Sequence, residues 1–240
     1  MKPVLIRQHL DLAPPGLLAA WLEARGLSYE VSRSWLEGPA PDLDCYAFVA
    51  SLGHERGVRD TDDAAVAAEL ALLERAVARG VPVLGLCFGG QVLAAVLGGR
   101  VERAPVPELG WVEIETDDAA RVPAGPWLEW HFDRFTTPPG GHEIARSAGG
   151  SQAFALGPHL GVQFHPETTV EIVDGWARLH GGLLPGLGID DAAALLAASP
   201  DRRRAAAAAA FRLFDAFAAG TALAAHGPPA PHRTRDQIAQ

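Results

Sequence analysis

The sequence has few cysteines and few basic residues, and both shortages narrow the class of protein. Only two of the 240 residues are cysteine, Cys45 and Cys87, which excludes a disulfide-rich secreted fold. Twenty lysines and arginines stand against 29 aspartates and glutamates, giving a formal net charge of −9. Nucleic-acid binding depends on a basic face, so nucleic acid is not expected as a partner. The one basic run, residues 202–204, is interpreted as the solvated face of an alanine-rich helix.

Long apolar runs are also missing. No stretch approaches the roughly 20 apolar residues that a membrane span requires. The first apolar run contains Arg7 and His9, which does not fit a signal peptide. We therefore expect no membrane partner and a cytoplasmic protein, where two free thiols suit the reducing conditions.

Hydrophobic residues make up 48% of the chain, and they follow an alternating order of strand-like and helix-like segments. The first part of the chain predicts strands at 4–8, 29–35, 46–52 and 81–86 and helices at 17–25, 62–79 and 90–97. Strands that are apolar throughout are typical of a parallel sheet with helices on both faces. The second part predicts short strands at 111–115, 127–131, 143–147, 153–156 and 160–164 and helices at 170–180, 190–198 and 200–219.

The most informative segment is residues 82–91, PVLGLCFGGQ. It matches the G-x-nucleophile-x-G turn between a strand and a helix, with Cys87 at the nucleophile position. Gly85 and Gly89 would leave room where the backbone doubles back. The thiol would lie at a helix N-terminus, whose partial positive charge favours a thiolate. Glycine-rich turns also bind phosphates and a buried cysteine is often only a small apolar residue, so this segment alone leaves both interpretations open.

A second segment, residues 161–167, is a strand that ends in His-Pro-Glu. In an extended chain residues i and i+2 face the same side, so His165 and Glu167 would project together. Pro166 disfavours the α conformation at His165 and so supports this arrangement. A nucleophile, a base and a group that orients the base are the parts of a catalytic triad. A structural histidine at a strand end is the alternative for His165 alone.

With both segments in this order, the chain resembles the class I glutamine amidotransferases, the type with a Cys-His-Glu triad. The matching segments are residues 85–91, GLCFGGQ, and residues 163–167, QFHPE. Residues 130–133, WHFD, are similar to the W-H-x-D segment of that family, and residues 52–54 resemble its loop after the third strand. The resemblance covers about residues 4–176.

This resemblance implies an α/β fold, a flavodoxin-like open, mostly parallel sheet with helices on both faces. It implies that a cysteine attacks the side-chain amide of glutamine and forms a γ-glutamyl thioester, without a cofactor. The implied site residues are Cys87, His165 and Glu167 for catalysis, the backbone N–H groups of Phe88 and of His54 or Gly53 for the oxyanion, and Gln91, Phe132 and Asp133 for substrate binding.

Two positions depart from the family pattern. His54 stands where many members have glycine, and its side chain would narrow the pocket. Phe132 replaces a frequent glycine. His131 and Asp133 could share a metal, but no third ligand follows at a suitable spacing, so no metal is expected.

The C-terminal part is expected to extend a single main domain. We expect an amidotransferase-like domain over 1–185, a helical extension packed on it over 186–226 and a flexible tail over 227–240. Phe211, Phe214 and Phe217 lie on one broad face of the last helix, and packing on the domain is preferred to a dimer or partner surface. Cys45 is expected in the core, and His159 on the surface or in a loop.

Three functions stay open at this point. The first is a glutaminase-type domain that releases ammonia for an acceptor on a separate synthase subunit, since the chain has no G-x-x-x-x-G-K-[ST] phosphate loop of its own. The second is a self-sufficient hydrolase of γ-glutamyl peptides or amines that uses the same triad. The third is a non-catalytic regulatory domain, against which the intact Cys87, His165 and Glu167 argue. The oligomeric state stays open too, a homodimer included.

Overall fold

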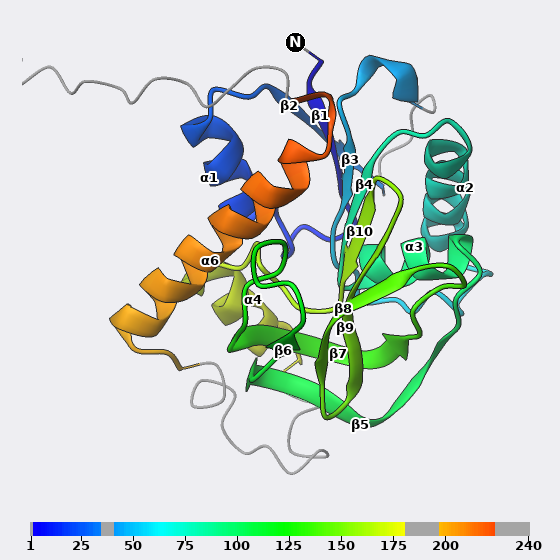
Figure 1. Ribbon diagram of the computed structural model, residues 1–240. Coiled ribbons are helices and arrows are strands. Elements are labelled where there is room, and N and C mark those ends of the chain that lie inside the picture. Colours follow the sequence, from blue (N-terminus) through cyan, green and yellow to red (C-terminus); the bar gives the residue numbers. More distant parts are fainter. Residues whose placement is uncertain (1, 35–40, 181–196, 224–240) are drawn as a thin grey trace, which may run out of the picture.

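A computed structural model describes residues 2–34, 41–180 and 197–223. Within these residues, eight strands form one sheet in the order β2-β1-β3-β4-β10-β9-β8-β6, and β5 and β7 form a separate ribbon (Figure 1). The strands are β1 Val4–Gln8, β2 Tyr29–Arg33, β3 Val49–Ser51, β4 Val83–Leu86, β5 Val101–Val112, β6 Glu115–Thr116, β7 Trp127–Phe135, β8 His142–Ser147, β9 Gly150–Leu156 and β10 His159–Val162. The helices are α1 Gly16–Ala24, the short 3-10 turn η1 Leu43–Cys45, α2 Ala64–Ala78, α3 Phe88–Val96, α4 Val170–His180 and α6 Pro200–Ala219.

The first five strands of the sheet are parallel, in the order expected for a flavodoxin-like fold. Their side chains alternate between two apolar layers. Val4 and Ile6 pack with α1 and α6 on one face, whereas Leu5 packs with α2 and α3 on the other. The predicted parallel sheet with helices on both faces is confirmed. Because the strands are parallel, their carboxyl ends share one edge, and the turns that carry function lie there.

The other half of the sheet is antiparallel, through β9, β8 and β6. The β5–β7 ribbon lies across the carboxyl edge of the parallel strands, at the bottom of Figure 1. The sequence did not predict β5 before residue 111, because Pro105 and Pro107 interrupt the pattern. The structure accommodates both prolines where the pairing register shifts, between Arg103 and Glu108.

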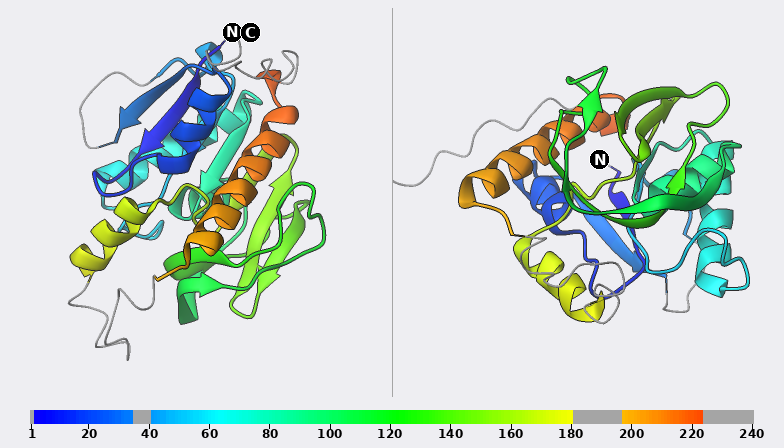
Figure 2. Two further views of the ribbon diagram at one scale, coloured as in Figure 1. Left: turned by 90° about the vertical axis from the view of Figure 1, so that its left-hand side faces the viewer. Right: turned by 90° about the horizontal axis from the view of Figure 1, so that it is seen from below.

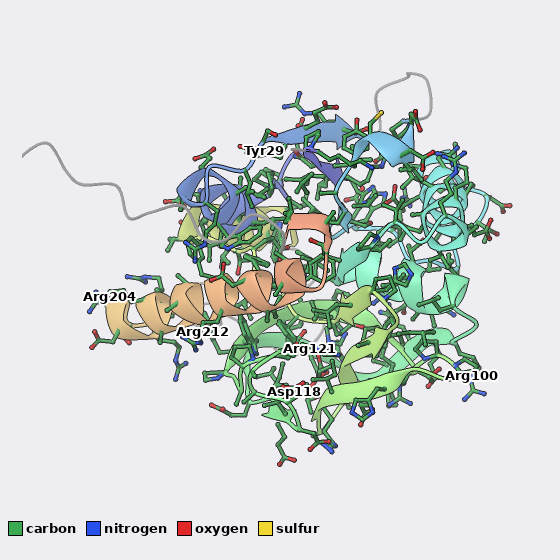
Figure 3. All side chains as sticks on the ribbon, turned by 45° about the horizontal axis from the view of Figure 1, so that its top comes forward. Tyr29, Arg100, Asp118, Arg121, Arg204 and Arg212 are labelled. Atoms are coloured by element: carbon green, nitrogen blue, oxygen red, sulfur yellow. The ribbon has the colours of Figure 1, made fainter. Side chains whose placement is uncertain are left out.

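Helix α6 packs against α1 and the sheet, as the two views of Figure 2 show. Phe214 is fully buried and its ring contacts Trp21 of α1, while Asp215 forms an ion pair with Arg25 at 2.7 Å. The opposite side of α6 is exposed, and Arg204 and Arg212 project from it (Figure 3). The prediction that the phenylalanines of this helix pack on the domain is therefore confirmed.

The start of α6 follows from local sequence. Ser199 caps the helix by accepting a hydrogen bond from the Arg202 N–H at 3.1 Å, and Pro200 occupies the first turn. The helix predicted at 190–198 falls mainly on residues outside the described part of the chain, as does the tail at 227–240. The division into domains stays a prediction.

Two expectations about single residues were wrong. Cys45 is exposed, because Asp42 accepts a hydrogen bond from the Asp44 N–H and closes a 3-10 turn before the strand begins at Val49. His159 is buried, because it begins β10 in the middle of the sheet. In the part of the chain that is described, no helix has the length and apolar character needed to cross a membrane.

The packing of α6 can be tested by removing its central ring. We expect Phe214→Ala to lower the free energy of unfolding by about 3–5 kcal/mol, because a fully buried ring leaves a cavity. Phe211→Ala, on the same helix but only partly buried, serves as the control and should cost clearly less. Urea unfolding measures both. A loss below about 1 kcal/mol for Phe214→Ala would contradict the packing role.

Candidate active site

The turn between β4 and α3 holds Cys87 in a strained conformation. Its φ of 51° and ψ of −107° make it the one non-glycine residue with a positive φ among the described residues. A Cβ on Gly85 would collide with the backbone of Gly89, and a Cβ on Gly89 would collide with Ser51 of β3. Glycines are therefore required on both sides of the turn, because the backbone itself fills the space. Such strain persists only where the surrounding structure imposes it.

The turn places the Cys87 side chain at the N-terminus of α3, where the helix dipole favours a negative charge. Cys87 is 5% exposed. Its sulfur lies 3.8 Å from Gln163 Nε2 and 4.0 Å from the carbonyl oxygen of Trp130. The residue is thus surrounded by β4, β7 and the chain after β10, rather than by apolar core alone.

His165 and Glu167 follow β10 and form a buried pair. The distance between His165 Nδ1 and Glu167 Oε1 is 2.8 Å, so the carboxylate orients the ring. The ring packs edge-on against Trp176 of α4, with centroids 4.6 Å apart. Its second nitrogen, Nε2, is buried and forms no hydrogen bond within the described residues. That nitrogen is therefore available for a proton transfer.

The electrostatics of this pair favour a charged histidine. Burial lowers the pKa of His165, but the negative charges of Cys87 and Glu167 outweigh burial and hold the pKa well above its ordinary value. The influence of Cys87 on His165 means that the thiol and the imidazole are electrostatically coupled. A thiolate next to an imidazolium is the activated form of a cysteine nucleophile.

Glu167 is positioned by the start of α1. Its carbonyl oxygen accepts a hydrogen bond from the Leu17 N–H at 2.8 Å. Gly16, with a φ of 42°, lies so close to that carbonyl that a Cβ would collide with it. The structure therefore brings together Cys87, His165 and Glu167, which lie up to 80 positions apart in the sequence.

Three backbone N–H groups near Cys87 lack a hydrogen-bond acceptor among the described residues. The N–H groups of Phe88, His54 and Gly53 donate no hydrogen bond within the described residues. Gly53 lies beside the catalytic candidate His165. A Cβ added to Gly53 would lie only 3.1 Å from His165 Cε1. Free N–H groups of this kind can bind an anionic oxygen near the sulfur, the role that the family resemblance implies for them.

The large side chain of His54 is accommodated by packing. Its ring stacks on His9 with centroids 5.7 Å apart and meets Phe88 edge-on at 5.2 Å. His54 Nδ1 accepts a hydrogen bond from the Glu55 N–H at 2.9 Å, which fixes the loop. Burial lowers the pKa of His54 to about 4, so its ring is neutral near pH 7.

Beneath His54 lies a buried polar cluster that sequence reasoning missed. Glu69 forms an ion pair with Arg7 at 2.9 Å and accepts a hydrogen bond from Ser51 at 2.8 Å, and His9 lies 3.6 Å from it. Burial opposes the charge of Glu69, but His9 and Arg7 outweigh it and lower the pKa of Glu69 to about 2. The signal in the sequence was Arg7 and His9 inside an apolar strand.

A cleft of about 120 Å³ opens at this point and is lined by Cys87, His165, His54 and Gln91 on one side. The other side is formed by Trp130, Phe132 and Asp133 of β7, with Arg103 of β5. The structure therefore brings the predicted substrate-binding residues to the same cleft as the triad.

Charged side chains surround Asp133 in the cleft wall. Asp133 lies 3.4 Å from Arg59 and 3.5 Å from Arg103, whose guanidinium also covers the Phe132 ring at 4.8 Å. Sequence reasoning missed both arginines, because neither belongs to a motif. Two guanidiniums therefore lie around this one carboxylate.

A buried acid–histidine cluster supports β7. His131 Nε2 lies 3.2 Å from Glu129 Oε2 and 3.3 Å from Glu108 Oε2, and Nδ1 donates to the carbonyl oxygen of Asp133 at 2.9 Å. Burial lowers the pKa of His131, but hydrogen bonds and charge from the two glutamates raise it to about 10. The sequence held one signal for this cluster. Glu129, His131 and Asp133 alternate along one strand and so share a face.

Comparisons with known proteins identify relatives of this chain. A family model described as glutamine amidotransferase class-I matches residues 57–174. The glutamine-hydrolyzing GMP synthase of Aeropyrum pernix is 39% identical over 116 residues, which are 42% of this chain and 22% of that protein. One subunit of the glutamine-hydrolyzing GMP synthase of Sulfurisphaera tokodaii is 38% identical over 96 residues, 36% of this chain and 50% of that protein. The matches thus cover half or less of these relatives.

Solved structures match nearly the whole chain. A glutamine amidotransferase from Methylobacillus flagellatus has a TM-score of 0.85 and 27% identity, and the match covers 98% of this chain and 99% of that one. A glutamine amidotransferase from Thermotoga maritima has a TM-score of 0.79 and 25% identity over 90% of this chain and 97% of that one.

The raised pKa of His131 predicts a pH dependence of stability. The folded protein keeps this proton up to about pH 10, whereas an unfolded histidine loses it near 6.5. The stabilisation is therefore complete below about pH 6.5 and is lost as the pH rises towards 10. We expect the urea midpoint to decrease as the pH is raised from 6.5 towards 10. The measurement uses Cys87→Ala protein, so that no thiolate acts on His131 or His165.

His131→Gln is the matched variant for this measurement. It should lower the free energy of unfolding at pH 6.5 by about 3–5 kcal/mol, because Glu129 keeps its burial without its cation. The fall in stability between pH 6.5 and 10 should become smaller in this variant. A urea midpoint that stays constant or rises over that range in the Cys87→Ala protein would contradict the charged state of His131.

Proposed function

Because the chain belongs to the class I glutamine amidotransferase family, we propose that it hydrolyses the side-chain amide of glutamine with Cys87 as the nucleophile. One observation carries the proposal. Cys87, in a strained strand-to-helix turn, and His165 line the same cleft. Glu167 is buried beside His165 and orients its ring.

In the first step, the Cys87 thiolate attacks the amide carbonyl of glutamine and forms a tetrahedral intermediate. Its oxyanion accepts hydrogen bonds from the Phe88 N–H and from the N–H of His54 or Gly53, none of which has an acceptor among the described residues. His165 transfers a proton from Nε2 to the amide nitrogen, the carbon–nitrogen bond breaks, and ammonia leaves. The product on the enzyme is a γ-glutamyl thioester.

In the second step, His165 removes a proton from water, and the resulting hydroxide attacks the thioester carbonyl. The carbon–sulfur bond breaks, glutamate leaves, and the Cys87 thiolate returns with His165 protonated. Glu167 holds the same ring orientation in both steps through its 2.8 Å contact with Nδ1. The raised pKa of His165 supports its role as the acid in the first step.

The substrate would lie in the cleft with its amino-acid end towards Phe132 and Asp133. The Asp133 carboxylate suits an α-ammonium group, and the neighbouring arginines suit an α-carboxylate. Gln91 would contact the bound glutamine from the floor of the cleft, which it lines.

The ammonia would be used by an acceptor site on another polypeptide, a separate synthase subunit. The relative from Sulfurisphaera tokodaii is named as one subunit of a GMP synthase, and the relative from Aeropyrum pernix is a longer GMP synthase. Both names are consistent with a glutaminase domain that delivers ammonia to a synthase.

The proposal is tested by product release from the purified protein with glutamine and with a panel of γ-glutamyl peptides and amines. We expect slow ammonia release from glutamine, lost in Cys87→Ala and reduced by about 10²–10⁴-fold in His165→Asn, because proton transfer is removed. Glu167→Gln should lower kcat because the ring loses its fixed orientation. Cys45→Ser is the matched control, since that thiol is exposed and distant from the cleft.

Two outcomes would overturn this function. Efficient Cys87-dependent hydrolysis of a γ-glutamyl peptide or amine, with glutamine a poor substrate, would make the protein a self-sufficient γ-glutamyl hydrolase. Equal ammonia release by Cys87→Ala and the unaltered protein would exclude Cys87 as the nucleophile.

A further inference from the structure

We propose that Gln163 stabilises the thiolate form of Cys87 through its side-chain amide, and that Gln91 sets the orientation of that amide. This inference rests on the proposed function for the identity of the nucleophile. It assigns a role to a residue that belongs neither to the triad nor to the oxyanion-binding backbone.

Gln163 is placed directly against the nucleophile. It follows β10, and its backbone N–H donates to the Gln152 carbonyl at 2.9 Å, so the sheet continues to hold it. The side chain is fully buried. Its Nε2 lies 3.8 Å from Cys87 Sγ, within the range of an N–H···S hydrogen bond.

The direction of the Gln163 amide is determined by its other contact. Gln91 Nε2 lies 2.9 Å from the Asp133 carbonyl oxygen and 3.3 Å from Gln163 Oε1. An amide nitrogen has two hydrogens, and Gln91 uses one for each of these acceptors. Because Gln163 Oε1 receives a hydrogen bond, its Nε2 must point the other way, towards the sulfur.

The chain of contacts has a fixed starting point in β7. The Asp133 carbonyl oxygen also accepts a hydrogen bond from His131 Nδ1 at 2.9 Å, and carbonyl oxygens cannot donate. Gln91 must therefore direct its side-chain nitrogen towards the Asp133 carbonyl oxygen. This orientation of Gln91 in turn determines the orientation of the Gln163 amide. Reversing Gln163 alone would place two amide nitrogens against each other and an oxygen against the sulfur.

The hydrogen bond from Gln163 mainly stabilises the charged form of the Cys87 thiol. A hydrogen bond to a buried ion is stronger than one to a neutral group, and the low dielectric of the interior strengthens it further. Gln163 thus favours the thiolate over the thiol. Loss of a hydrogen bond of this kind should raise the apparent pKa of the Cys87 thiol by about one to two units.

The test measures that pKa directly, from the pH dependence of the rate at which iodoacetamide alkylates the protein. Cys45→Ser is the background for all variants, so that Cys87 is the one thiol that reacts. Gln163→Met removes the donor with little change of shape. Gln163→Glu keeps the acceptor for Gln91 but replaces the donor with a carboxylate. Gln91→Leu removes the group that orients Gln163.

Gln8→Met is the matched control. Gln8 is also a buried glutamine at the carboxyl end of a parallel strand, but its amide donates to the Leu10 carbonyl at 2.9 Å and does not contact the sulfur. We expect the alkylation pKa to rise in Gln163→Met, to rise further in Gln163→Glu because of charge repulsion, and to rise by a smaller amount in Gln91→Leu. The control should leave it unchanged. Urea midpoints report any general loss of stability.

Two results would overturn the role of Gln163. An unchanged alkylation pKa in Gln163→Met, with or without a lower urea midpoint, would leave Gln163 a packing residue. An equal rise in Gln8→Met would mean that the pKa follows general loosening rather than the contact with sulfur. If Gln163→Glu does not fold, Gln163→Met and Gln91→Leu still decide the question. Because alkylation does not require glutamine turnover, the outcome is independent of the activity assays with Cys87→Ala.

Discussion

The close approach of the backbone after β4 to its two neighbouring strands is the constraint on which the rest of the site depends. A Cβ at Gly89 would collide with Ser51 at the end of β3, and a Cβ at Gly90 would collide with Val162 at the end of β10. The turn is therefore held between these two strands, and Cys87 is forced to a φ of 51°. The same contact with β10 sets the distance from Cys87 to the histidine that follows that strand.

The second wall of the site is held by a buried charged cluster in addition to the apolar packing of β7. His131 carries the positive charge between Glu108 and Glu129, and it also fixes the Asp133 carbonyl oxygen. Buried ions are tolerated only when they are paired, so the ion pairs of His131 restrict the position of β7. The β5–β7 ribbon meets the first turn of α3, where Gln91 contacts the same carbonyl oxygen. Electrostatics and hydrogen bonding therefore act together to keep the cleft in one shape.

The loop before the site shows how a departure from the family pattern is accommodated. A histidine at position 54 would fill the cleft if its ring pointed there freely. Instead the ring packs between His9 and Phe88, and its Nδ1 accepts the Glu55 N–H. His9 is itself held by the Glu69 cluster, so the loop depends on polar groups beneath the sheet edge. The backbone N–H groups of Gly53 and His54 have no acceptor among the residues described.

Local chemistry by itself determined the parallel strands, the turn at Cys87 and the His165–Glu167 pair. Each follows from apolar runs, glycine positions or period-two alternation within a few residues. The tertiary structure decided what joins distant segments: Gln163 against the sulfur, Glu108 and Glu129 around His131, and the arginines at the cleft. It also placed Cys45 outside the core and carried β5 through two prolines. Such contacts depend on which strands become neighbours in the sheet. A local sequence pattern does not specify which strands these are.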